Sequence, residues 1–242
     1  MAIDLIEQLF DNEEMLDVAV RRLDGTTAVD LGRRAAPPLP VSDALEPILP
    51  DGLRRGSTVS VTGSVSLLLA LLGEASAGGA WCALVGFPRV SAEAAREYGV
   101  DLTRLAIVPA AGGEHWTTAV GALLDAVDVV AARPPRLVPG DIRRLAARAR
   151  TRDAVLMPFL VGNDLWPGAD VRLTARGGHW SGIGAGTGRL TARKVEVHAE
   201  GRGAAARPRT ATLWLPARGG GAQIVDERPV APVHELPVEL AG

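Results

Sequence analysis

Short apolar runs alternate with stretches of helical spacing through the middle of the chain, and this alternation predicts its fold. Near-continuous apolar strands are expected at residues 58–62, 81–86, 105–109, 127–132 and 154–160, with helices at 66–77, 91–98, 115–126 and 141–152. Strands of a parallel sheet are apolar throughout because helices cover both faces of the sheet. The pattern therefore predicts an α/β domain with a mostly parallel sheet and helices on both faces.

The pattern changes after Asp170. Residues 171–175, 189–199 and 210–216 alternate apolar and polar positions, and glycine-rich segments connect them. Such alternation is typical of antiparallel strands with one solvated face, so we expect these strands to extend the sheet at its edge. The glycine run at 182–188 fails the G-x-G-x-x-G spacing of a dinucleotide site, which favours a flexible hairpin.

The segments around this core differ in composition. Residues 1–32 place Ile6, Leu9 and Phe10 at amphipathic spacing, which predicts an N-terminal helical segment that packs on the core or on a partner. Residues 33–48 are rich in alanine and proline and are expected to form a linker before a core at 49–217. Residues 218–242 contain a GGG run and three prolines, which predicts a disordered tail.

Composition excludes several classes of protein. Hydrophobic residues make up 47% of the 242 residues, yet no apolar run approaches the roughly 20 residues that span a bilayer, so we expect a soluble, cytoplasmic protein. The formal net charge of −2 gives no general attraction to nucleic acid or membrane. Cys82 is the single cysteine, and the four histidines lack ligand spacing. We therefore expect no metal site, no cofactor and no hydrolase site.

Residues 49–86 read as turn, strand, glycine turn, apolar helix and strand, which is the opening unit of a P-loop ATPase. A working loop has the form G-x-x-x-x-G-K-[ST], in which backbone N–H groups and the lysine hold the phosphates and the hydroxyl holds Mg²⁺. Counting forward from Gly63 places residues 68–70 at the Gly-Lys-Thr positions, and counting backward from Cys82 places Ser64 at the lysine. Neither register contains a lysine. The degenerate phosphate loop consists of Gly63, Ser64, Val65 and Ser66.

Three sequence segments support a resemblance to a known family. LPDG at 49–52, GVDL at 99–102 before a strand that ends in Pro109, and VDVV at 127–130 resemble the RecA recombinase core, over residues 49–217. LPDGLRRGSTVSVTGSVSLLLALL and SAGGAWCALVG are similar to ImuA-type proteins of actinobacteria, RecA-like accessory factors of damage-induced mutagenesis. The resemblance implies two partners, an inactive Y-family polymerase homologue and, through it, an error-prone replicative-type polymerase.

The chain departs from RecA at the residues that carry chemistry. Arg133 stands near the place of the metal-binding Walker B carboxylate, and Gly86-Phe87-Pro88 replaces the carboxylate that orients the attacking water. With the lysine, three parts of phosphoryl-transfer chemistry are missing, so we expect no ATPase activity. The intervals 133–154 and 160–171 also have no room for the long DNA-binding loops of RecA, so a RecA-like filament on single-stranded DNA is not expected.

Four residues are candidates for contact with a partner or a nucleic acid. Arg144, Arg148 and Arg152 recur every four residues along one predicted helix, so they form a stripe that suits phosphates or an acidic surface. Trp166 follows a predicted strand and suits base stacking or an interface anchor. A solvated helix face and a tryptophan that covers the edge of the core are the alternatives.

Two functions follow from these features. The first is a non-catalytic, RecA-like adaptor of damage-induced translesion synthesis that acts through protein contacts. The second is a diverged recombinase-like ATPase that still binds ATP and DNA. A division inhibitor produced in the same damage response is a third option. Nucleotide binding separates the first two.

Overall fold

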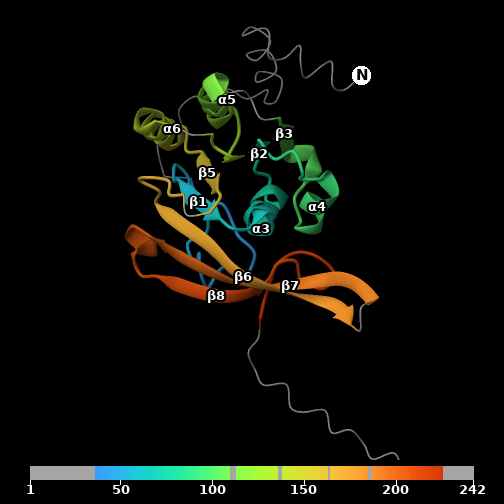
Figure 1. Cartoon of the computed structure of the whole chain (residues 1–242). Coiled ribbons are helices and arrows are strands. Elements are labelled where there is room, and N and C mark those ends of the chain that lie inside the picture. Colours follow the sequence, from blue (N-terminus) through green and yellow to red (C-terminus); the bar gives the residue numbers. More distant parts are fainter. Residues whose placement is uncertain (1–35, 110–112, 136–137, 163, 185–186, 226–242) are drawn as a thin grey trace, which may run out of the picture.

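A computed structural model describes residues 36–109, 113–135, 138–162, 164–184 and 187–225. Its centre is a nine-stranded sheet in the order β3-β2-β4-β5-β1-β6-β7-β8-β9 (Figure 1). The parallel strands are β1 (Val59–Thr62), β2 (Cys82–Val85), β3 (Leu105–Val108), β4 (Val129–Ala132) and β5 (Val155–Leu160). β1 pairs in parallel with both β5 and β6. The α/β fold with a mostly parallel sheet is therefore as predicted.

Helices cover both faces of this sheet. α3 (Val65–Ala77) and α4 (Ala92–Glu97) pack on one face, and α5 (Gly113–Ala126) and α6 (Pro139–Thr151) pack on the other. Successive residues of β2 follow this division, because Cys82 and Leu84 join the α3 side while Ala83 and Val85 join the α5–α6 side. Burial on both faces explains why these strands are apolar throughout.

The antiparallel half of the sheet is longer than the sequence indicates. β6 (Val171–Gly184) and β7 (Thr187–Gly201) form a long hairpin, followed by β8 (Arg209–Trp214) and β9 (Gln223–Ile224). β6 pairs with β1 only from Val171 to Thr174. Among the described residues, those beyond Arg176 on β6 and before Arg193 on β7 pair with no third strand. We call the described residues of 175–184 and 187–194 the outer ribbon; beyond Arg176 and before Arg193 it projects past the body of the sheet, and Lys194 at its base still pairs with Trp214 of β8 (Figure 1).

The expected linker at 33–48 is packed in its described part. Leu39 exchanges two backbone hydrogen bonds with Leu53, and Leu45 and Ile48 are fully buried in the core. The prolines around them do not separate two bodies, because the apolar side chains between them are buried in the core. The core therefore begins near Leu39, while residues 1–35 lie outside the described part of the chain.

At the other end, the expected tail from residue 218 starts with ordered structure. β9 pairs with β8 through Leu213 and Ile224, and the Val225 N–H donates to the Thr212 carbonyl. The rest of that tail, residues 226–242, lies outside the described residues. Among the described helices, none is long and apolar enough to cross a membrane.

Candidate functional site

The turn between β1 and α3 occupies the position of a phosphate loop. β1 ends at Thr62 and α3 begins at Val65, so only Gly63 and Ser64 connect them. Ser64 is the N-cap of α3, where its Oγ accepts from the Leu67 N–H at 3.2 Å, and the residue is 4% exposed. A serine in this role satisfies a free N–H of the first helical turn. A two-residue turn whose side chain is already engaged offers no loop of N–H groups around an anion.

Strand β6 closes the space beside this turn. Gly63 has a φ of +88°, and a Cβ placed on it would lie 2.4 Å from the Ala175 carbonyl oxygen. Only glycine fits such a close approach of two backbone segments in this conformation. The β6 backbone therefore lies directly against the turn that connects β1 and α3.

The other two catalytic positions of an ATPase hold residues of different chemistry. Phe87, directly after β2, is 5% exposed and meets the Phe159 ring edge-to-face, with centroids 5.5 Å apart. Arg133 follows β4 and is exposed, and its backbone N–H donates to the Val85 carbonyl. An aromatic pair and a cation thus stand where a metal-dependent hydrolase needs carboxylates.

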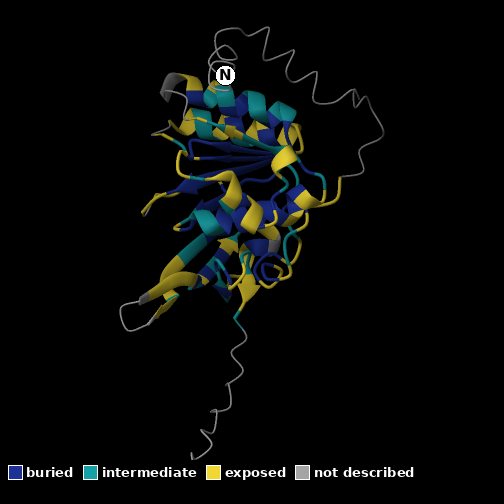
Figure 2. Ribbon diagram, turned by 90° about the vertical axis from the view of Figure 1, so that its right-hand side faces the viewer, coloured by how far each residue is buried: buried dark blue, intermediate teal, exposed yellow. Residues whose placement is uncertain are grey.

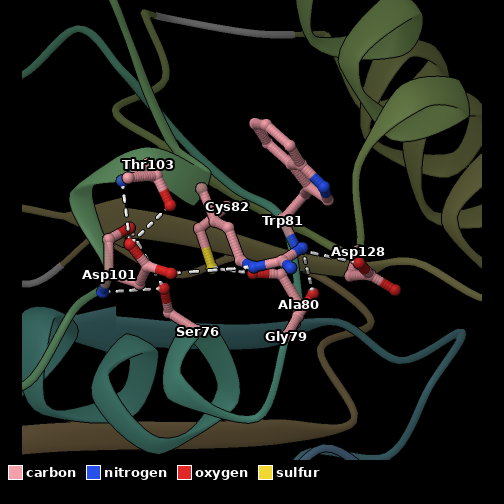
Figure 3. A network of polar contacts seen from close by, with 9 residues as sticks. Ser76, Gly79, Ala80, Trp81, Cys82, Asp101, Thr103 and Asp128 are labelled. Atoms are coloured by element: carbon pink, nitrogen blue, oxygen red, sulfur yellow. Dashed lines mark hydrogen bonds and ion pairs between the residues drawn. The ribbon is translucent and has the colours of Figure 1, made fainter. Parts of the chain in front are cut away.

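The carboxylate nearest β4 in sequence lies at the amino ends of the parallel strands, whereas the β1–α3 turn lies at their carboxyl ends. Asp128 precedes the strand and accepts from the Trp81 N–H at 2.9 Å (Figure 3). It also pairs with Arg55 at 2.6 Å. Beside it, burial raises the pKa of the Cys82 thiol to about 12, and the negative charge of Asp128 adds to this rise. Asp128 therefore connects the amino ends of neighbouring strands. It lies at the end of the strands that is opposite the β1–α3 turn.

The predicted arginine stripe on α6 is ion-paired. Arg148 and Arg152 both bind Asp125 of α5, with Arg148 Nε at 2.8 Å and Arg152 Nε at 3.0 Å from Asp125 Oδ1. Arg144 pairs with Asp141 one turn away. The hydrogen bond from Arg148 holds the pKa of the Asp125 carboxyl below its ordinary value, with further lowering from the charges of both arginines. The stripe thus fastens α6 to α5, and much of its charge is neutralised.

Two other arginines of the same helix are more available. Arg143 and Arg150 are exposed, and no ion pair is recorded for either within the described part of the chain. The four-residue periodicity drew attention to Arg144, Arg148 and Arg152, whereas the partner carboxylate is 23 residues away from Arg148 in sequence. Because the two residues are far apart in sequence, the sequence of the helix alone did not indicate this ion pair.

Trp166 is buried, at 3% exposure, in the apolar cluster that includes Trp116 of α5. It lies at the wall of a cavity of about 440 Å³ at the carboxyl ends of β4 and β5, which Arg133, Val161 and Leu165 also line. Val161 and Leu165 are 53% and 75% exposed. Trp166 therefore supports an open surface without facing solvent, and it is not available for base stacking in this conformation. The exposed tryptophan is Trp180 of the outer ribbon.

Comparison with known proteins places this geometry in context. The profile of a family described as the MT3502 N-terminal domain matches residues 47–168, just over half of the chain. The uncharacterised protein Rv3395c of Mycobacterium tuberculosis is 32% identical over 170 residues, which cover 66% of this chain and 81% of that protein. The crystal structure of the RadB recombinase superposes with a TM-score of 0.55 and 12% identity, covering 76% of this chain and 97% of that one. The fold is RecA-like.

Proposed function

This chain belongs to the MT3502 N-terminal domain family, and we propose that it acts as a non-catalytic accessory protein of damage-induced, error-prone translesion DNA synthesis. In this role a RecA-like frame presents protein-binding surfaces and neither binds nor hydrolyses ATP. The proposed role in mutagenesis rests on the sequence resemblance to ImuA-type proteins. The proposed absence of ATP binding rests on the geometry around Gly63.

The observation that carries the loss of nucleotide chemistry is the approach of β6 to the β1–α3 turn. A triphosphate needs several backbone N–H groups aimed at one point and a lysine to offset its charge. Here Ser64 caps its own helix, Ala175 lies against Gly63, and the single lysine of the chain, Lys194, is on β7.

The partners follow from the same resemblance. An inactive Y-family polymerase homologue is the proposed direct partner, and an error-prone replicative-type polymerase is reached through it. The open cavity lined by Arg133, Val161 and Leu165 supports this proposal, because exposed apolar side chains beside an exposed cation are typical of an interface core with a polar rim.

Nucleotide binding by the full chain tests the first part of the proposal. A ligand present at 100 times its Kd stabilises the folded state by about 2.7 kcal/mol, which raises the Tm of a domain this size by roughly 5–10 °C. We expect no such rise with 1 mM ATP and Mg²⁺ and no saturable signal in calorimetric titration. Micromolar, Mg²⁺-dependent binding would instead support the diverged ATPase.

A cellular assay tests the second part. Deleting the gene should abolish damage-induced mutagenesis, and Ser64→Ala should leave it intact because Ser64 serves the helix and not a nucleotide. The full chain should also co-purify with the Y-family homologue encoded by the same genome. Loss of mutagenesis in Ser64→Ala at normal protein level, or no complex with the homologue, would contradict the proposal.

A further inference from the structure

The outer ribbon concentrates positive charge on a protein whose formal net charge is −2. It carries Arg176, Arg189, Arg193 and Lys194, and no aspartate or glutamate. Within the described residues no ion pair is recorded for any of the four. On α6, by contrast, carboxylates engage three of the arginines. Arg193 donates to the Gly177 carbonyl, and Arg176 lies opposite Glu196 in the hairpin, just outside the ribbon. The ribbon therefore presents cations that form no ion pair within the described part of the chain.

The same ribbon exposes large apolar side chains. Trp180, Ile183 and Leu190 are 44%, 58% and 47% exposed, and most of the ribbon lies at the surface (Figure 2). The Arg193 guanidinium lies over the Trp180 ring, 5.9 Å from its centroid. Trp180 lies opposite Arg193 in the hairpin, whereas Ile183 lies opposite Gly188 and His179 opposite Lys194, so strand alternation puts Trp180 on one face and Ile183 and Lys194 on the other. Exposed aliphatic groups on a projecting element that are rimmed by charge mark a binding surface. Its ligand should supply carboxylates together with apolar side chains.

One segment of this chain has that composition. Residues 3–17, IDLIEQLFDNEEMLD, contain six carboxylates and no cation, and Ile6, Leu9 and Phe10 stand at the i, i+3, i+4 spacing of one helical face. We propose that residues 3–17 dock on the Ile183 and Lys194 face of the outer ribbon of the same chain, with their apolar positions on Ile183 and Leu190 and their carboxylates on Lys194 and the cations around it. This proposal stands independently of the function proposed above.

The connection between the two is long enough. Eighteen residues separate Asp17 from Ala36, and an extended chain of that length spans up to about 60 Å. A compact core of this size has a diameter of roughly 40 Å. The segment thus reaches any face of the core, and a tether of this kind supplies an effective concentration of about a millimolar, so weak docking suffices.

Charge alone would also suit a nucleic acid, but the apolar residues favour the acidic segment. Phosphates and bases would use the cations and Trp180, whereas Ile183 and Leu190 are aliphatic and gain little from a polar backbone. An amphipathic segment uses both kinds of side chain. The apolar acidic segment is therefore the better match to the aliphatic face of the ribbon.

Lys194 gives a direct test because it is the only lysine in the chain. A carbodiimide joins a carboxylate to an amine only where the two groups meet, so treatment of the full chain should join Lys194 to carboxylates of residues 3–17 within monomers, as read by peptide mass spectrometry. Lys194→Arg keeps the charge, removes the amine and should abolish the product.

Charge variants test the specificity of the contact. Arg176→Glu with Arg189→Glu should lower the yield of cross-linked monomer about fivefold or more, since each exposed ion pair contributes up to about 1 kcal/mol. The matched control is Arg143→Glu with Arg150→Glu on α6, which makes the same charge change elsewhere and should leave the yield unchanged. Asp11→Asn with Glu13→Gln and Glu14→Gln should reproduce the loss without altering any described residue.

Three results would overturn the proposal. Lys194 joined only to carboxylates of residues 226–242 would assign the ribbon to the other end of the chain. Products found only in dimers would assign it to a second copy. No product with residues 3–17, together with binding of a fluorescent single-stranded oligonucleotide that Arg176→Glu with Arg189→Glu abolishes, would assign it to nucleic acid.

Discussion

Replacing Phe87 with alanine tests whether the position after β2 serves the packing of the core. The ring is 5% exposed and packs edge-to-face on Phe159. Removing a buried phenyl ring costs the transfer free energy of its atoms plus the cavity left behind, about 3–5 kcal/mol. Because a domain is stable by only about 5–15 kcal/mol, Phe87→Ala should remove a large share of the free energy of unfolding.

Urea denaturation followed by far-UV circular dichroism measures this loss, provided that the m-value stays unchanged. Phe87→Leu keeps most of the volume and should cost less, mainly the aromatic pairing of about 0.5–1.5 kcal/mol. Val161→Ala is a matched control at a side chain that is 53% exposed, where the expected change is within about 0.5 kcal/mol. A loss below about 1 kcal/mol in Phe87→Ala would refute the view that this position serves packing.

Three further predictions concern single polar groups. The folded-state pKa of Asp125 is lowered, so the ionised carboxylate stabilises the fold above its unfolded pKa of about 3.9, and this contribution is lost as the pH falls through the folded-state pKa. Asp125→Asn should therefore reduce the dependence of the free energy of unfolding on pH in the acid range. An unchanged dependence would contradict this. Ser64→Ala should lower the free energy of unfolding by about 1 kcal/mol through the lost N-cap, while Ser64→Thr should lose less, and equal losses in the two would argue against capping. With a pKa of about 12, the Cys82 thiol should not react with a disulfide reagent at pH 8 until urea unfolds the chain; rapid native-state reaction would show that it is accessible.

The parallel half of the fold was predictable because its signal is local. Strands such as Cys82–Val85 are buried on both faces and therefore apolar at every position, and the helices between them carry clear spacing. The same local reading identified the missing lysine at Ser64. It did not show that Ser64 caps its helix or that Ala175 lies against Gly63, because the second contact joins residues more than a hundred positions apart.

Other features were hidden by composition. Glycines at 177, 178 and 182 interrupt the alternation of β6, so a strand of 14 residues reads as one of five. Prolines around Leu39 and Leu45 indicate a linker, although both leucines are buried. The ion pair between Arg148 and Asp125 joins two helices whose facing sides depend on the sheet between them. None of these three features could be predicted without knowing the tertiary structure.

The contact between Gly63 and the Ala175 carbonyl bears on how the protein can evolve. Building a nucleotide pocket at this turn would take an insertion that lengthens the β1–α3 turn, withdrawal of a strand from its neighbour, and three charged side chains at separate places. No single base change in the gene supplies a useful part of this rearrangement. If the proposed adaptor role is correct, descendants of this sequence are expected to diversify their surfaces while the contact between Gly63 and Ala175 is kept.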